Sequence, residues 1–176
     1  MKTYRNCILL FLFCLFLYGT FSGLIPLLDP DEPVYGETAK EMLATGDWIS
    51  PRIYGEFWYD WLEAISFSIF GVSTWAARLP SVLLGALTPC YLFLSSRRFL
   101  GERAALRAGF ICATSLEIIV LARSSVTDML LCLTLTVALM SFLRKEYAAA
   151  YIACGLALLT KGPVGFGFPA LIVGLW

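Results

Sequence analysis

Six apolar runs separated by short charged turns restrict what this chain can fold into. They cover Cys7–Leu28, Leu79–Leu94, Ala108–Ala122, Met129–Leu143, Ala148–Thr160 and Val164–Trp176. About 20 apolar residues are needed to cross a bilayer, so the first run is long enough, whereas several later ones are short for a full span. Charged residues make up only 15% of the chain, against about 25% in soluble domains. We therefore expect an all-α polytopic membrane protein.

The first apolar run has two interpretations. It follows Lys2 and Arg5, as the core of a cleaved signal peptide would. However, the run is long, no A-x-A cleavage site follows it, and further apolar runs come later. A retained first membrane helix is the better prediction.

The composition excludes several classes of function. Thirteen basic and thirteen acidic residues balance, so no nucleic-acid partner is indicated. The chain has no histidine, which excludes histidine-based catalysis and histidine-ligated metal within these residues. Its six cysteines all lie in apolar runs without a CxxC pair, so we interpret them as small packing residues rather than as disulfide or zinc ligands.

The segment Leu27–Asp60 is the long exception to the apolar pattern, and it holds eight of the thirteen acids. Asp29 can cap a helix that runs to about Ala44 and stops at Gly46. Aromatic residues follow, which favours a position in the headgroup region of the membrane. We expect this helix, and a second one within Trp61–Val72, to lie at the interface rather than to cross the bilayer.

The distribution of charge predicts the orientation. With the N-terminus in the cytoplasm, eight of the thirteen basic residues fall on the cytoplasmic side, and the Leu27–Leu79 loop carries nine acids against three bases on the outside. The positive-inside rule selects this arrangement. The polar turns Arg123–Asp128 and Lys161–Gly162 then lie on the same outer side as the acidic loop.

Three groups of residues at the outer side are candidates for chemistry. Asp31 and Glu32 lie at a helix N-terminus, which favours their ionised form, so that a carboxylate could accept a proton or stabilise positive charge. Asp128 precedes the fourth apolar run, and Lys161 ends the fifth. The alternatives stay open: both acidic positions could simply cap helices, and Lys161 could cap carbonyl groups or extend its ammonium to the interface.

Several motifs together resemble a known group of enzymes. They are Asp29-Pro30-Asp31-Glu32-Pro33 with Tyr35, Ala39 and Met42, Gly46-Asp47-Trp48, Tyr59-Asp60, Ala122-Arg123 with Thr127-Asp128-Met129, and Thr160-Lys161-Gly162-Pro163. In this order they resemble the polytopic GT-C glycosyltransferases of the protein O-mannosyltransferase and aminoarabinose-transferase type (glycosyltransferase family 39-like).

The resemblance implies transfer of a sugar, with inversion, from a polyprenyl-phosphate carrier to a protein or lipid acceptor at the outer face of the cytoplasmic (inner) membrane. It makes Asp31 the catalytic carboxylate, with Glu32 supporting it and Asp128 as a second acid. Lys161 and Arg123 would bind the carrier phosphate. Asp60 stands where some branches have a carboxylate that can bind a divalent metal, so such a metal is a possible cofactor.

The chain departs from this family pattern at two places. A Lys-Pro-Pro-Leu segment, whose lysine would be a second phosphate-binding cation, is missing between Asp60 and Trp61, and Val34 replaces the arginine of the aminoarabinose branch. We interpret the chain as the N-terminal part of a GT-C domain, with residues 1–28 as the first membrane helix, 29–78 as the extracytoplasmic loop and 79–176 as further membrane helices. An incomplete, inactive form is expected. The alternative is a non-catalytic membrane protein, such as a transporter subunit or an assembly scaffold.

Overall fold

The computed structural model describes residues 2–27, 31–48, 52–53, 56–57 and 60–175. In these residues the elements are α1 (Lys2–Gly19), α2 (Asp31–Thr45), β1 (Arg52–Ile53), β2 (Glu56–Phe57), α3 (Trp61–Phe70), α4 (Thr74–Ala113), α5 (Leu116–Arg123), α6 (Asp128–Leu143), α7 (Tyr147–Lys161) and α8 (Val164–Gly174). The predicted all-α architecture is therefore confirmed. A two-stranded antiparallel ladder, in which Arg52 pairs with Phe57, is the small addition that the sequence pattern did not predict.

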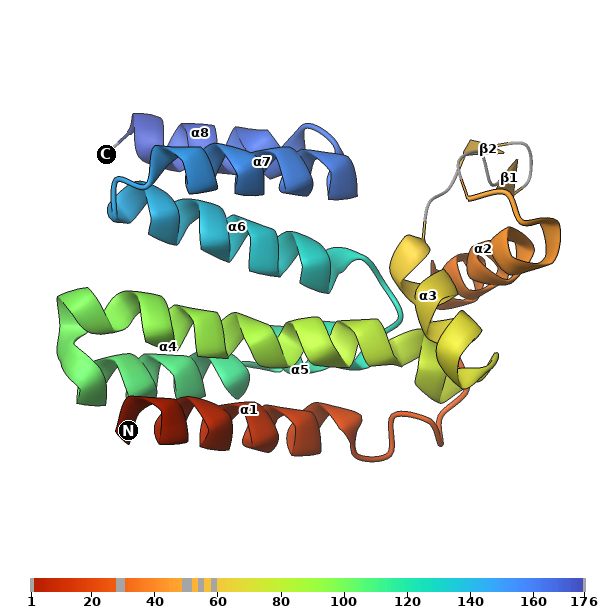
Figure 1. Ribbon diagram of the computed structural model, residues 1–176, viewed down its shortest axis with the longest axis horizontal. Helices are drawn as coiled ribbons and strands as arrows, with labels where there is room; N and C mark the ends of the chain where they lie inside the picture. The colour runs from red at the N-terminus through yellow and green to blue at the C-terminus, as the bar shows by residue number, and fades with distance from the viewer. Residues whose placement is uncertain (1, 28–30, 49–51, 54–55, 58–59, 176) are drawn as a thin grey trace.

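The long helices run side by side, and the smaller elements gather at one end (Figure 1). Helices α2 and α3 and the β1–β2 pair lie at this end, which we call the loop end. The N-terminus, the bend within α4 and the α6–α7 turn lie at the opposite end, which we call the basic end. Helix α4 contacts α1, α3, α5 and α6, so it is the central element of the bundle.

Helix α4 is two helical legs joined at Gly101. This residue has φ +75° and ψ 165°, a conformation that glycine adopts without the steric cost of a Cβ. The chain reverses there, and the second leg returns alongside the first (Figure 1). Among the described residues, α4 is the one helix long and apolar enough to cross a membrane by length and composition, while α3, α6, α7 and α8 are shorter apolar helices.

The core of the bundle is formed where α1, α4, α5 and α6 meet. Fully buried side chains here include Leu10, Tyr18, Phe93 and Met129. Many large apolar side chains instead point away from the core, among them Leu159 at 82% exposure. Extensive exposed apolar surface is unfavourable in water but favourable against lipid, which agrees with a membrane-embedded bundle.

The loop end has a small apolar core of its own, built from α2, α3 and the start of α4. Ala39 and Met42 of α2 pack with Phe67 of α3 and Ala76 of α4. The predicted stop of α2 is confirmed: Gly46 has φ +71°, and its N–H donates to the Met42 carbonyl at 3.1 Å. The predicted second short helix is also confirmed, as α3. This core fixes α2 and α3 against the end of the bundle.

Candidate active site

The candidate site lies at the loop end, where α2 begins, α5 ends, α6 begins and α7 ends (Figure 1). The bundle thus brings the acidic loop, the turn before Asp128 and the turn after Lys161 to one end, as the charge pattern predicted. The described contacts form two groups of side chains there, one buried and one partly exposed.

A buried ion pair between Glu32 and Arg78 forms the centre of the first group. The Arg78 Nε donates to Glu32 Oε1 at 3.0 Å, and its Nη2 donates to Oε2 at 2.8 Å. Both side chains are almost inaccessible: Arg78 is 6% exposed and Glu32 is 3% exposed. Two parallel bonds from a planar guanidinium fix the carboxylate in direction as well as position. Glu32 is therefore held rigidly, one residue after Asp31.

Arg78 also donates hydrogen bonds to the segment that connects α1 and α2. Its Nη1 donates to the carbonyl oxygens of Ser22 at 2.6 Å and Ile25 at 2.9 Å, and its Nη2 donates to that of Pro26 at 3.1 Å. One arginine on α4 thus joins the end of α1 to the beginning of α2. A lysine could not repeat this pattern, because it lacks the fixed fork of donors.

The turn before α6 is hydrogen-bonded to the same Glu32 carboxylate. The Ser125 N–H donates to Glu32 Oε1 at 2.6 Å. The Ser125 hydroxyl contacts Glu63 Oε1 on α3 and lies 3.2 Å from the Ala77 carbonyl oxygen. Ser125 is fully buried, so these bonds replace water completely. The network therefore links α2, α3 and α4 to the turn that leads to Asp128.

Two further buried acids, Asp60 and Glu63, lie beside this network at the start of α3. Burial raises the pKa of Asp60 to about 7, against the N–H bond from Glu63 that lowers it. Burial, followed by the negative charges of Asp60 and Glu32, raises the pKa of Glu63 to about 10. Glu63 is thus protonated at neutral pH, and its acid hydrogen can serve the Ser125 contact. Its Oε2 is buried and has no hydrogen-bond partner among the described residues.

Asp128 and Lys161 form the second group. The Lys161 Nζ lies 2.5 Å from Asp128 Oδ1, and the lysine and aspartate side chains are 38% and 30% exposed. Thr127, not Asp128, is the N-cap residue of α6, and the Asp128 carboxylate contacts α7. The two residues were separate candidates in the sequence, and the structure joins them across α6 and α7.

The remaining candidates are placed differently. Arg123 Nη1 donates to the Leu17 carbonyl oxygen at 3.0 Å, so its guanidinium faces α1 and the described contacts do not join it to Lys161. Asp31 is the first residue of α2, but its side chain and the whole of Asp29 lie outside the described part of the structure. The catalytic role of Asp31 and the phosphate-binding role of Arg123 stay predictions.

The residues do not show a fit to the possible divalent metal. Asp60 Oδ1 accepts the Glu63 N–H at 3.2 Å and caps α3. In the part of the chain that the structure describes, no group of three or more cysteine, aspartate or glutamate side chains is arranged to hold a metal ion. The metal role of Asp60 therefore stays a prediction from resemblance, and no step is assigned to a metal.

Sequence reasoning missed Ser125 and Glu63, and it did not predict the buried pair of Arg78 with Glu32. Glu63 and Arg78 did carry a signal in the sequence. Each is a charged residue with apolar neighbours, which indicates a charge that needs a partner inside the fold. Ser125 carried none, because its importance comes from a backbone N–H and from burial. All six cysteines are free, as predicted.

Comparison with known proteins supports a sugar-transferase family. Residues 57–176 match the family described as dolichyl-phosphate-mannose-protein mannosyltransferase. An undecaprenyl phosphate-alpha-4-amino-4-deoxy-L-arabinose arabinosyl transferase from Aeromonas hydrophila is 31% identical over 92% of this chain and 33% of its own length. An uncharacterised protein from Aquifex aeolicus is 31% identical over 90% of this chain and 35% of its own length.

Solved structures agree with the sequence relatives. The crystal structure of ArnT from Cupriavidus metallidurans bound to undecaprenyl phosphate has a TM-score of 0.85 and 28% identity, over 96% of this chain and 34% of that one. Its apo state gives a TM-score of 0.86 and 27% identity, over 99% of this chain and 36% of that one. The chain spans about a third of the length of the relatives it matches.

These matches confirm the resemblance inferred from the motifs and identify the bundle as a GT-C membrane fold. The matched family segment covers α3 to α8, and the structural likeness extends over α1 and α2 as well. The chain belongs to the dolichyl-phosphate-mannose-protein mannosyltransferase family.

Proposed function

We propose that this chain carries the donor side of a glycosyltransferase that moves a sugar from a polyprenyl-phosphate carrier to a hydroxyl of a lipid or protein acceptor. The observation that supports this most is the convergence of Asp128–Lys161 and the Glu32–Arg78–Ser125 network at one end of the bundle. An anionic carrier and an ionised base need such groups at a single membrane face. The ArnT structure bound to undecaprenyl phosphate supports the carrier class.

The reaction would be a single inverting displacement. The acceptor oxygen attacks the anomeric carbon, the bond from that carbon to the phosphate oxygen breaks, and the electron pair leaves with the phosphate. Asp31 takes the hydroxyl proton, and Lys161 stabilises the negative charge of the departing phosphate. Glu32 acts as a positioning residue, because its two bonds to Arg78 hold the first turn of α2.

Lys161 can exchange Asp128 for the carrier phosphate. The pair is about a third exposed, and ion pairs of this kind contribute only about 0–1 kcal/mol. A phosphate oxygen can therefore replace the carboxylate at small cost. The released Asp128 would then face the incoming substrates as the second acid of the site.

The proposed setting is a cytoplasmic membrane with the N-terminus inside. The basic end carries Lys2, Arg5, Arg97, Arg98, Arg103, Arg107, Arg144 and Lys145, and the positive-inside rule places such an end in the cytoplasm. The loop end would then face outward, where acceptors are reached. Arg123, at the end of α5, would contribute positive potential there.

A binding measurement tests the proposed site for the carrier phosphate. The purified chain in nanodiscs is titrated with undecaprenyl phosphate, and binding is measured by native mass spectrometry. Lys161→Gln should weaken binding at least tenfold, whereas Asp128→Asn, which frees Lys161, should strengthen it. Lys145→Gln is the matched control, an exposed cation at the basic end. Equal affinities for Lys161→Gln and Lys145→Gln would exclude the phosphate role.

A transfer assay tests the proposed catalytic role of Asp31. Membranes holding a full-length relative, in which the aspartate that matches Asp31 is replaced, are supplied with a radiolabelled polyprenyl-phosphate sugar and a lipid acceptor. Asp31→Asn should lower the rate by about 10²–10⁴-fold, the usual contribution of a general base, with unchanged membrane insertion. Transfer at the full rate by that variant would mean that Asp31 only caps α2. Absence of carrier binding by the unaltered chain would support the non-catalytic alternative instead.

A further inference from the structure

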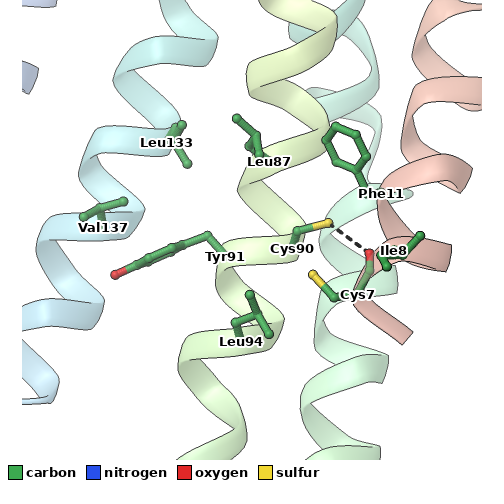
Figure 2. Close-up of a pocket in the computed structure, with 9 residues that line it drawn as sticks. All are labelled: Cys7, Ile8, Phe11, Leu87, Cys90, Tyr91, Leu94, Leu133 and Val137. Atoms are coloured by element: carbon green, nitrogen blue, oxygen red, sulfur yellow. Dashed lines mark hydrogen bonds between the residues drawn. The ribbon is translucent and has the colours of Figure 1, made fainter. Parts of the chain in front are cut away.

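An apolar groove opens between α1, α4 and α6, away from the candidate active site (Figure 2). Its volume is about 510 Å³, and it is lined by Cys7, Ile8, Phe11, Leu87, Cys90, Tyr91, Leu94, Leu133 and Val137. Ile8 is 58% exposed and Leu87 is 45% exposed, so the groove opens to the outside of the bundle. In a membrane-embedded bundle such an opening faces lipid rather than water.

The groove runs lengthwise along the bundle. Leu87 and Leu94, both on its wall, are seven residues apart on α4, which corresponds to about 10 Å along a helix. Leu94 lies three residues before Arg97, at the basic end. The groove thus begins near the basic end and extends towards the middle of the bundle, which suits an extended apolar chain that enters from the membrane interface.

A group of polar side chains, which we call the arginine corner, adjoins the groove at Tyr91 near the basic end. Arg144 Nη2 donates to the Tyr91 hydroxyl at 3.0 Å, and its Nη1 donates to Ser95 Oγ at 3.1 Å. Its Nη2 also lies 2.6 Å from Glu146 Oε2, and Arg98 Nη1 lies 3.8 Å from Glu146 Oε1. Two arginines therefore share one carboxylate and leave a net positive charge. The Arg144 Nε is buried and has no hydrogen-bond acceptor among the described residues.

The surroundings of this corner are strongly basic. Eight basic residues (Lys2, Arg5, Arg97, Arg98, Arg103, Arg107, Arg144 and Lys145) lie at this end of the chain's path, against Glu102 and Glu146. All of the eight except Arg144 are exposed. Glu102 already accepts hydrogen bonds from Thr3 and Asn6. The end therefore attracts anions from the membrane surface.

We propose that the groove and its arginine corner form a binding site for an anionic glycerophospholipid. One acyl chain lies along the groove, and the headgroup phosphate accepts hydrogen bonds from Arg144 and Arg98. Basic pockets between membrane helices are suited to anionic headgroups, and the charge here complements a headgroup with a net negative charge rather than a zwitterionic one. The site is independent of the proposed sugar transfer, because it lies at the opposite end of the bundle.

The groove is better suited to bind an acyl chain than a helix of another protein. The wall is mainly apolar, and its polar groups already have partners: the Tyr91 hydroxyl is bonded to Arg144, and the Cys90 thiol donates to the Cys7 carbonyl oxygen at 3.7 Å (Figure 2). A flexible chain fits an irregular groove without directional contacts, whereas the directional and charged groups described here lie at the groove's interfacial corner. This division into an apolar run and a cationic end corresponds to the structure of a phospholipid.

Native mass spectrometry of the purified chain in detergent tests the proposal, with dioleoyl phosphatidylglycerol and dioleoyl phosphatidylcholine as the two probes. The acyl chains of the two lipids are identical, so a difference in affinity reports the headgroup. We expect at least tenfold tighter binding of phosphatidylglycerol. Arg144→Gln should remove most of this preference, whereas Arg144→Lys should keep part of it. Equal affinities of the unaltered chain for the two lipids would overturn the proposal.

Two control variants separate the site from general attraction. Arg103→Gln removes an exposed cation from the same end, and it should leave binding within twofold of the unaltered chain. Leu133→Trp fills the groove and should abolish tight binding, while Leu159→Trp, at an 82% exposed position on α7, should not. Binding lost equally in Arg103→Gln and Arg144→Gln, or retained in Leu133→Trp, would contradict the proposal. A thermal melt of each variant shows which ones are folded.

Discussion

Replacing Arg78 by methionine should destabilise this protein more than any other single change at the loop end. The substitution keeps much of the side-chain volume but removes the guanidinium. Glu32 would lose both of its Arg78 bonds and would remain buried with the Ser125 N–H. Ser22 is buried, and its carbonyl oxygen would lose the donor that lies 2.6 Å away. Ile25 and Pro26 are exposed, so their carbonyl oxygens can accept hydrogen bonds from water instead.

The magnitude follows from these partners. Removing one member of a buried ion pair costs about 3–5 kcal/mol, because the other charge is left without compensation. An unsatisfied buried carbonyl adds about 1–3 kcal/mol. The sum is comparable with the whole stability of a typical domain, about 5–15 kcal/mol. Arg78→Lys should recover only part of the loss, since it restores the charge without the paired bonds.

Denaturant unfolding in detergent micelles, followed by tryptophan fluorescence, measures these free energies. Glu32→Gln alone should cost several kcal/mol, and Glu32→Gln combined with Arg78→Met should cost less than the two single changes added together. Glu37→Gln is the matched control on α2, because its pair with Lys40 is exposed and should contribute about 0–1 kcal/mol. If Glu32→Gln costs no more than Glu37→Gln, the buried pair does not stabilise the loop end.

Two further changes test other parts of the structure. The raised pKa values of Asp60 and Glu63 mean that the folded state binds more protons than the unfolded state above about pH 4. The free energy of unfolding should therefore fall as the pH rises from 5 to 7, and Glu63→Gln should reduce that slope; an unchanged slope in melts across this range would contradict the assignment. Gly165 packs against α7 so closely that an added Cβ would lie 2.1 Å from the Ala157 carbonyl carbon. Gly165→Ala should thus destabilise the protein by at least about 1–3 kcal/mol. Gly167→Ala, with open space around its Cβ position, should stabilise it by about 0.4–1 kcal/mol. Similar unfolding midpoints for these two variants would refute the close contact of α7 and α8.

The sequence alone determined the class of fold and the grouping of its polar turns. Apolar runs joined by short charged turns can satisfy their backbone hydrogen bonds in lipid only as helices. Successive apolar runs cross the bundle in opposite directions, so alternate turns must meet at the same end. This is why Asp128, Lys161 and the start of α2 share the loop end. The end of α2 was also predictable from the local sequence, because a glycine such as Gly46 is the residue that most readily takes the left-handed conformation after a helix.

The packing of the helices sets which of these residues contact one another. Glu32 meets Arg78 across 46 positions and Ser125 across 93, and nothing local in the sequence specifies such pairs. Lys161 and Asp128 look like independent helix ends until the packing of α7 on α6 brings them together. The protonated state of Glu63 likewise depends on burial among other acids. Such contacts arise because folding removes these groups from water, and each buried polar group must then find its partner wherever the packed chain supplies one.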